Sequence, residues 1–210
     1  MKPLPLTGQE TGIDLGLESF ATRADGEHIK NPRWYRTAEG HFALCQRRVA
    51  RRQKGSKRRA KAVQLLAKAH QHIANQRRDF HHQEAHKLVE QYDVIYHEDL
   101  RVRTMVQNHH LAKSISDAGW SQFLTLLTFK AASAGKRVVA VNPASTSQRC
   151  SGCGTMVWKG LSTRWHACPE CGLSLHRDHN SARDILRLGH EHVYGQAVAS
   201  GPGYGLQART

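Results

Sequence analysis

Four cysteines in two Cys-x-x-Cys pairs constrain the fold more than any other feature of the sequence. The pairs are Cys150 with Cys153 and Cys168 with Cys171, fourteen residues separate them, and each is followed by glycine. Two tight turns at this spacing can present four thiolates to a tetrahedral zinc ion, with Zn–S bonds of about 2.3 Å. Glycine has no β-carbon, so the backbone can fold toward the sulfur atoms. We therefore predict one structural zinc ion, with two redox disulfides as the alternative.

A zinc ion held by four protein ligands is closed to substrate, so this ion should stabilise the fold rather than catalyse. The remaining cysteine, Cys45, lies alone in a helical stretch and is expected to be a buried, inert thiol. Trp158, Arg164 and Trp165 lie between the two pairs. They are candidates for stacking on bases, and packing inside a small ribbon core is an equal alternative.

The chain is strongly basic, with 31 Lys and Arg against 17 Asp and Glu and a formal net charge of +14. Twelve of the basic residues and no acidic residue lie between Gly40 and Arg78. Because Lys and Arg neutralise phosphates without reading sequence, we expect segment 47–61 to contact the backbone of RNA or of an RNA–DNA hybrid. A solvated helical hairpin is the alternative. The basic residues of this segment are Arg47, Arg48, Arg51, Arg52, Lys54, Lys57, Arg58, Arg59 and Lys61.

Hydrophobic patterning predicts alternating strands and helices. Residues 11–29 alternate between apolar and polar and predict a strand and a hairpin, with Asp14 in the first strand. Apolar residues at helical spacing over 36–92 are interrupted by "QKGSK" at 53–57, which predicts two helices joined by a tight turn. The run Val94 to Tyr96 predicts a buried strand that ends in adjacent acids.

The second half continues the alternation. Residues 114–135 predict one helix capped by Ser116 or Asp117 and closed near Gly135, and "KRVVAVNP" at 136–143 predicts another strand. "HNSARDILRLG" predicts a terminal helix, and residues 191–210 have the Gly and Ser content of a disordered tail. No run of about 18 apolar residues and no secretory leader are found, so we expect no membrane association and a cytoplasmic, nucleoid-associated location.

Three carboxylates occupy positions that a two-metal nuclease requires. Asp14 lies inside the first strand, Glu98 ends a later strand, and Asp178 precedes the last helix. Carboxylate oxygens are the ligands that Mg²⁺ prefers, and paired ions about 4 Å apart activate water and stabilise the leaving oxygen. The pattern alone leaves open that the first two are solvated strand ends and that Asp178 is a helix cap.

Five motifs together resemble one protein family. They are "GIDLG" at 12–16, "HEDL" at 97–100, "NHHLAKSISDAGW" at 108–120, "TSQRCSGCG" at 146–154 and "RDHNSARDIL" at 177–186. In this order they resemble the C-terminal half of TnpB, the OrfB proteins of bacterial insertion sequences, which are related to the compact type V CRISPR nucleases. The resemblance extends from about residue 11 to residue 189.

The resemblance implies an α/β fold of the RNase H-like, RuvC-like type with a long helical hairpin insertion and an inserted four-cysteine zinc ribbon. It also implies a catalytic Asp14, Glu98 and Asp178 with Mg²⁺, two ions in number, and a guide RNA that selects the DNA to be cut. The expected divisions are a nuclease core at 11–145 with the basic hairpin at 36–92, a ribbon at 146–176, a last catalytic motif and helix at 177–190, and a tail at 191–210.

One departure concerns the start of the chain. Full-length relatives carry a long N-terminal part that helps to bind guide RNA and recognises the target-adjacent motif, whereas eleven residues precede "GIDLG" here. We therefore expect a transposon-associated, RNA-guided DNA endonuclease that lacks its recognition half and needs that half, or another transposon protein, as a partner. The alternative is a catalytically inactive, truncated zinc-ribbon protein that binds DNA or RNA in transposition or its regulation.

Several polar residues receive secondary assignments. Asn180 and Ser181 are candidates for positioning Asp178 or capping its helix, and Ser147 and Gln148 for approaching the nucleic acid. The helical and loop histidines have no matching ligand set, so we assign them to the surface or to a face that meets nucleic acid. They are His81, His82, His86, His109 and His110.

Overall fold

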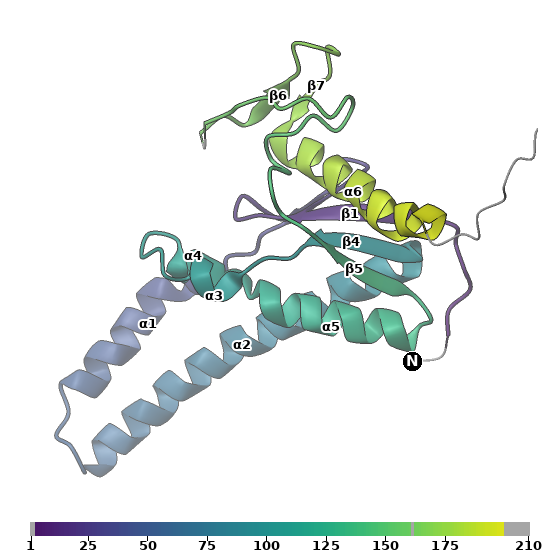
Figure 1. The fold of residues 1–210 in the computed structure, drawn as a ribbon. Helices are drawn as coiled ribbons and strands as arrows, with labels where there is room; N and C mark the ends of the chain where they lie inside the picture. The colour runs from purple at the N-terminus through teal and green to yellow at the C-terminus, as the bar shows by residue number, and fades with distance from the viewer. Residues whose placement is uncertain (1–2, 161, 200–210) are drawn as a thin grey trace, which may run out of the picture.

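A five-stranded mixed sheet runs through the centre of the protein, with helices on both of its faces (Figure 1). The computed structural model describes residues 3–160 and 162–199. No helix in these ranges is long and apolar enough to cross a membrane. The strand order is β3-β2-β1-β4-β5. The strands are β1 Glu10–Leu15, β2 Ser19–Arg23, β3 His28–Lys30, β4 Val94–Glu98 and β5 Arg137–Val141.

Strand β1 pairs in parallel with β4 and antiparallel with β2, and β4 pairs in parallel with β5. Parallel neighbours require a crossover, which α2 supplies between β1 and β4 and which α3, α4 and α5 supply between β4 and β5. The helices are α1 Trp34–Ala50, α2 Lys57–Gln91, α3 Val102–Met105, α4 Ala112–Ala118, α5 Trp120–Ser133 and α6 Arg177–Ala199.

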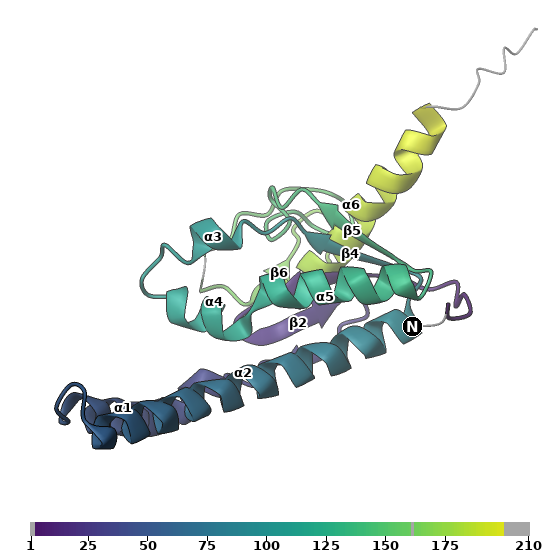
Figure 2. The ribbon, with the colours of Figure 1, turned by 90° about the horizontal axis from the view of Figure 1, so that it is seen from below.

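Side-chain alternation along β4 separates two layers of apolar packing. Val94 and Tyr96 pack with Ile185 of α6 on one face of the sheet. Ile95 belongs to the larger core on the other face, which includes Phe123 of α5. Figure 2 shows α5 and α2 lying along that second face. Phe123 is fully buried, and removal of such a ring costs about 3–5 kcal/mol.

Helix α6 lies directly on β1, and Gly12 permits this close approach. A β-carbon at Gly12 would overlap the carbonyl oxygen of Ala182 and lie 2.6 Å from the backbone nitrogen of Leu186. Any other residue would therefore push α6 away from the sheet. The approach also fixes the start of α6 above the carboxyl end of β1, the strand that carries Asp14.

Helices α1 and α2 form a hairpin that projects away from the sheet (Figures 1 and 2). Ser56 caps α2, because its hydroxyl accepts a hydrogen bond of 3.2 Å from the backbone nitrogen of Arg59. Two helices are found where the periodicity predicts them, although α1 begins at Trp34, two residues before the predicted start.

The prediction of one helix over 114–135 is wrong. Two helices, α4 and α5, meet at Gly119, which has a φ of 68°. The predicted cap Asp117 serves another element: its Oδ2 accepts a hydrogen bond of 2.9 Å from the backbone nitrogen of Tyr35, at the start of α1. Its Oδ1 accepts one of 2.8 Å from Arg77. A left-handed residue ends one helix before the next begins.

The prediction of a disordered tail from residue 191 is wrong for residues 191–199, which continue α6. Three side chains converge on Glu10 of β1 and hold this extension. The Tyr194 hydroxyl donates to Glu10 at 2.6 Å, the Tyr96 hydroxyl at 3.0 Å, and His190 Nε2 lies 2.7 Å away. These side chains are far apart in sequence, so composition alone does not show the contact. The rest of the predicted tail, 200–210, lies outside the described residues.

Candidate active site and metal centre

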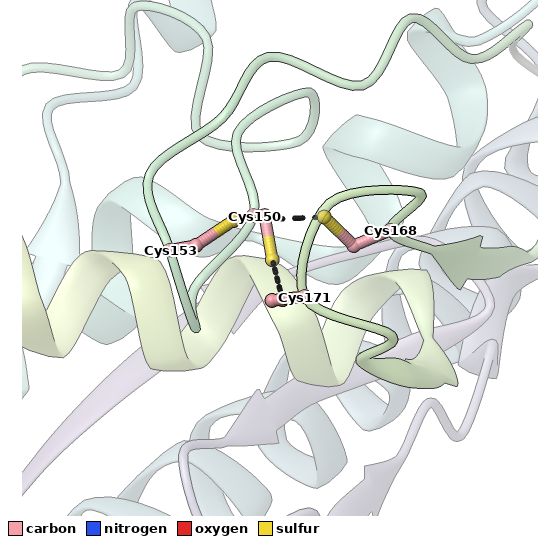
Figure 3. Close-up of side chains that lie close together, drawn as sticks. All are labelled: Cys150, Cys153, Cys168 and Cys171. Carbon is pink, nitrogen blue, oxygen red and sulfur yellow. Dashed lines mark hydrogen bonds between the residues drawn. The ribbon is translucent and has the colours of Figure 1, made fainter.

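The two cysteine pairs fold into two tight turns that face each other (Figure 3). In the first, the backbone nitrogen of Gly154 donates to the carbonyl oxygen of Cys150 at 2.9 Å. In the second, the nitrogen of Gly172 donates to the carbonyl oxygen of Cys168 at 3.1 Å. Both glycines have left-handed backbones, with φ values of 79° and 73°. The glycines therefore close the two turns that carry the sulfur atoms.

The four sulfur atoms fit one tetrahedral ion. The Sγ atoms of Cys150 and Cys171 are 3.6 Å apart, as are those of Cys153 and Cys168, and all four Sγ atoms lie within 4.8 Å of one another. Bonds of about 2.3 Å in a tetrahedron place sulfur atoms about 3.8 Å apart. The four cysteines therefore lie close enough together to bind a metal ion such as zinc.

A second, two-stranded sheet follows the first cysteine pair, formed by β6 Trp165–Ala167 and β7 Ser174–His176. Its core position is taken by His166, which is fully buried. Trp158 and Trp165 have exposed fractions of 82% and 57%. The alternative that these indoles pack inside a ribbon core is therefore wrong, and both remain accessible for stacking.

The three predicted carboxylates line one pocket of about 550 Å³. Asp14 extends from β1, Glu98 ends β4, and Asp178 lies in the first turn of α6. Strands β1 and β4 are parallel, and Ile13 pairs with His97. The next residue along each strand is acidic: Asp14 in β1 and Glu98 in β4. The parallel register thus explains why residues far apart in sequence reach the same pocket.

Burial raises the pKa of Asp14 well above its usual range, and the charges of Glu98 and Asp178 raise it further. Burial also raises the pKa of Glu98, although a hydrogen bond from Thr146 opposes this effect. Mutual repulsion of carboxylates that line one pocket is relieved when a cation binds between them. The electrostatics of the pocket therefore favour a bound cation.

Two residues near Glu98 were missed by the sequence reasoning. The buried Thr146 hydroxyl donates a hydrogen bond to Glu98. Asp184 of α6 is fully buried, and the charge of this acid contributes to the raised pKa of Glu98. Arg187 holds Asp184 Oδ1 with hydrogen bonds of 2.6 and 3.1 Å. The helical period of α6 places position 184 on the sheet side, and that period is the sequence signal that could have found it.

Comparison with known proteins identifies the family. Residues 2–109 match the OrfB_IS605 family, described as a probable transposase, and residues 120–185 match the Cas12f1-like TNB domain. The chain belongs to the OrfB_IS605 family. This confirms the predicted resemblance to TnpB and OrfB proteins, and some relatives are named TnpB-like.

Two relatives illustrate the extent of the similarity. A protein of Streptomyces pristinaespiralis named putative RNA-guided DNA endonuclease is 38% identical over 89% of this chain and 47% of its own length. The Escherichia coli K12 protein named putative RNA-guided DNA endonuclease InsQ is 32% identical over 95% of this chain and 54% of its own length. The chain therefore spans about half the length of these relatives.

The fold also matches a solved structure. In the cryo-EM structure of a Cas12f1-sgRNA-target DNA complex, the protein aligns with 87% of this chain and 50% of its own chain, with a TM-score of 0.61 and 16% identity. At this identity the match shows a shared α/β fold.

In this OrfB-family chain, most of the predicted basic residues are exposed at the tip of the α1–α2 hairpin. Arg48, Arg51, Arg52 and Arg58 line a depression there. Arg59 differs, because its Nη1 donates hydrogen bonds to the carbonyl oxygens of Val49 and Arg52 and so closes the turn. The tip therefore combines exposed guanidinium groups with one that is used internally.

Ser147 and Gln148, the two polar residues predicted to approach the nucleic acid, differ in their exposure. Ser147 is exposed and lines the pocket of the three carboxylates. Gln148 uses its side chain internally: Nε2 donates to the carbonyl oxygen of Lys159 at 3.0 Å, and Oε1 accepts from the nitrogen of Lys159 at 2.7 Å. The structure thus gives Gln148 the role of holding the loop after the first cysteine pair.

The assignment of His81 to the surface is wrong. Its exposed fraction is 2%, and Nε2 lies 2.9 Å from the carbonyl oxygen of Ala118. The other four predicted surface histidines are exposed. Cys45 is buried, as predicted.

Proposed function

We propose that this chain is the nuclease half of an RNA-guided DNA endonuclease, with a RuvC-like core at 11–145, a zinc ribbon at 146–176 and the last catalytic motif at 177–190. Asp14, Glu98 and Asp178 would hold two Mg²⁺ ions. The single observation that supports this most strongly is the convergence of the three acids on one pocket, where burial and mutual repulsion raise the pKa of Asp14. The family and the names of its relatives support it independently.

The residues of the pocket would have different roles in phosphodiester hydrolysis. When bound, the metal ions supply an activated water and stabilise the leaving oxygen. Thr146 orients Glu98 through its hydroxyl. Asp14 and Asp178 approach from β1 and α6, so ligands come from both sides of the pocket. Ser147 is exposed and lines the pocket, and it would contact the sugar-phosphate backbone.

The nucleic acid would extend from this pocket to the tip of the α1–α2 hairpin and across the ribbon. We propose DNA and a guide RNA as partners, since two relatives carry the name RNA-guided DNA endonuclease. The guanidinium groups at the hairpin tip would neutralise phosphates, and Trp158 and Trp165 would stack on unpaired bases. The part of the relatives that this chain does not span, or another transposon protein, is the proposed protein partner.

The test is cleavage of labelled single-stranded DNA, with and without guide RNA and the remaining part of a relative. We expect cleavage that requires Mg²⁺ or Mn²⁺ and is lost in Asp14→Ala, Glu98→Ala and Asp178→Ala. Asp79→Ala is the matched control, because Asp79 is exposed on α2. Undiminished cleavage by the Asp14 variant would overturn the proposed site. Salt-sensitive binding without cleavage under all these conditions would favour an inactive binding protein instead.

A further inference from the structure

A lysine between the two cysteine pairs is held at its backbone by one side chain. The backbone nitrogen of Lys159 donates a hydrogen bond of 2.7 Å to Gln148 Oε1, and its carbonyl oxygen accepts one of 3.0 Å from Gln148 Nε2. The backbone nitrogen of Val157 also donates to the carbonyl oxygen of Gln148 at 2.9 Å. These hydrogen bonds fix the point at which the Lys159 side chain leaves the loop.

The side chain of Lys159 reaches toward the interior of the two-stranded sheet. Its Nζ donates a hydrogen bond to Nδ1 of His166. A lysine ammonium group can only donate, so Nδ1 is the acceptor and carries no proton. His166 is fully buried in β6, on the face of the strand opposite the exposed Trp165. The hydrogen bond therefore holds the positive charge of Lys159 on the buried side of this sheet.

His166 keeps an unpaired polar atom inside this small core. Within the described residues, His166 Nε2 is buried and has no hydrogen-bond partner. An unpaired buried donor opposes folding, so an apolar side chain of similar size would by itself stabilise the core better. The imidazole differs from an apolar side chain at this position in the acceptor that it offers to Lys159. The hydrogen bond to Lys159 thus explains why a polar ring occupies the core.

Lys159 lies on the side of the two buried cysteines. Cys150 and Cys168 are 0% and 5% exposed, whereas the other two cysteines of the pairs are exposed. Burial lowers the pKa of Lys159 and the charge of Arg177 lowers it further, but the thiolate charges of Cys150 and Cys168 raise it. The ammonium group is thus close enough to interact with the two sulfur atoms that water screens least.

We propose that Lys159 is the counter-charge of the zinc–thiolate centre and that Gln148 and His166 hold it in place. A zinc ion carries two positive charges and four thiolates carry four negative ones, so the loaded centre has an excess of negative charge. A fixed positive charge beside the buried sulfur atoms stabilises this charge where water does not. Lys159 acts through its charge and is not a ligand. The inference rests on the proposed zinc ribbon and adds the residues that set how tightly zinc is held.

The wild-type chain is tested first, by metal analysis, and we expect one zinc ion per chain. A folded chain that binds no zinc would overturn the proposed ribbon and this inference with it. Zinc affinity is then measured by competition with a coloured chelator, a readout that requires no nuclease activity. Lys159→Met should lower the affinity by at least about tenfold, the lower end of the effect of residues that surround metal ligands. Equal affinities of the wild type and Lys159→Met would overturn this inference and leave the ribbon in place.

Three further variants separate the charge from its placement. Lys159→Arg keeps the positive charge and should restore most of the affinity. Gln148→Ala keeps the charge but releases the loop, so it should lower the affinity less than Lys159→Met does. Lys68→Met is the matched control, because Lys68 is exposed on α2 and its replacement removes the same charge. An equal loss of affinity in Lys159→Met and Lys159→Arg would show that the shape of the side chain acts, rather than its charge, and would overturn the proposal.

Cobalt in place of zinc gives a spectroscopic signature of the charge. A nearby positive charge lowers the energy of the thiolate electrons. The charge-transfer band from thiolate to cobalt should therefore move to longer wavelength in Lys159→Met and stay in place in Lys159→Arg. An unchanged band in Lys159→Met would overturn the proposal.

The wild-type protein supplies a measurement that no folding defect of a variant affects. With zinc bound, an amine-reactive acylating reagent should modify Lys159 more slowly than Lys68, because partial burial and the hydrogen bond to His166 protect the Lys159 nitrogen. Mass spectrometry of the digested chain measures both rates. Equal acylation of Lys159 and Lys68 would mean that the ammonium group is in water and would overturn the proposal.

Discussion

The side-chain amide of Asn180 spans the backbone on both sides of Cys150: Nδ2 donates a hydrogen bond of 2.7 Å to the carbonyl oxygen of Arg149. Its Oδ1 accepts a hydrogen bond of 3.0 Å from the nitrogen of Ser151. Asn180 is fully buried and lies two residues after Asp178 on α6. One side chain therefore connects the first cysteine pair to the helix turn that carries Asp178.

Replacement of Asn180 by alanine should break the connection between the first cysteine pair and the helix turn that carries Asp178. The change leaves the carbonyl oxygen of Arg149 and the nitrogen of Ser151 without this partner, at a cost of about 1–3 kcal/mol. We expect a lower melting temperature, zinc content near one per chain and reduced cleavage, because Asp178 loses its support. Asn75→Ala on the exposed face of α2 is the control. Normal cleavage by a folded Asn180→Ala protein would contradict this coupling.

Replacement of Cys171 by serine tests the same coupling from the metal side. The change removes one thiolate from a set of four, so zinc affinity should fall sharply. We expect zinc loss, a less stable ribbon and reduced cleavage, measured by metal analysis and by the single-stranded DNA assay. Cys45→Ala serves as the control, since Cys45 is buried far from the pairs in sequence and should leave zinc content unchanged. A zinc-free protein that cuts DNA normally would show that ribbon and nuclease pocket are independent.

The elements that the sequence predicts best depend on local patterns. The Cys-x-x-Cys-Gly turns form as expected because each is specified within five residues. The strands that carry Asp14 and Glu98 follow from short apolar runs, and the shared pocket follows from their parallel register. The resemblance to OrfB proteins supplied the choice of Asp178, which the pattern alone left open as a helix cap.

The features that the sequence does not predict depend on distant contacts. His81 looks like a surface residue of a basic helix, but α5 and the end of α4 cover it. Residues 191–199 look like tail, but Glu10 of β1 accepts a hydrogen bond from the hydroxyl of Tyr194. Asp184 looks like an exposed helical acid until α6 is placed on the sheet. For His81 and Tyr194 the deciding partner lies dozens of residues away, beyond any local periodicity.

Asp14→Asn should raise the stability of the Mg²⁺-free protein while it abolishes cleavage. The pKa of Asp14 is raised above its ordinary value of 3.8 in the folded chain, so the ionised form opposes folding at every pH above that value. Asparagine removes this penalty at neutral pH and changes little below pH 3.8. Each pKa unit is worth about 1.4 kcal/mol, and each kcal/mol raises the melting temperature of a domain this size by about 2–4 °C. Equal melting temperatures at neutral pH would contradict the raised pKa.

The hairpin tip should set the salt dependence of nucleic-acid binding. Arg51→Gln, Arg52→Gln and Arg58→Gln each remove an exposed guanidinium group. On a duplex, the slope of log K against log salt should become shallower by about 0.9 for each phosphate that the protein no longer neutralises. Arg59→Gln is the contrast, because Arg59 closes the turn through the carbonyl oxygen of Val49. Arg59→Gln should therefore lower the free energy of unfolding and affect the salt slope less than the tip variants do. An unchanged slope in all three tip variants would show that the hairpin tip does not contact the nucleic acid.

The pair of Asp93 and Lys136 should stabilise the N-terminal end of β1 in a pH-dependent way. Burial alone would raise the pKa of Asp93, but hydrogen bonds from Lys136 and from the backbone nitrogens of Thr7 and Gly8 lower it to about 2. Because the folded pKa lies below the ordinary value of 3.8, the stabilisation is fully present above pH 3.8 and is lost as the pH falls toward 2.

Asp93→Asn should therefore destabilise the protein at neutral pH, since the Lys136 side chain is 0% exposed and would lose its counter-charge. Breaking such a pair by removal of one partner costs about 3–5 kcal/mol when fully buried, and the partial exposure of Asp93 reduces this figure. Urea unfolding at neutral pH and near pH 2 gives the measurement. The difference between wild type and Asp93→Asn should shrink at the lower pH, whereas Asp79→Asn on the exposed face of α2 should show no such dependence. A difference that is constant with pH would mean that packing, rather than the charge of Asp93, holds Lys136 in place.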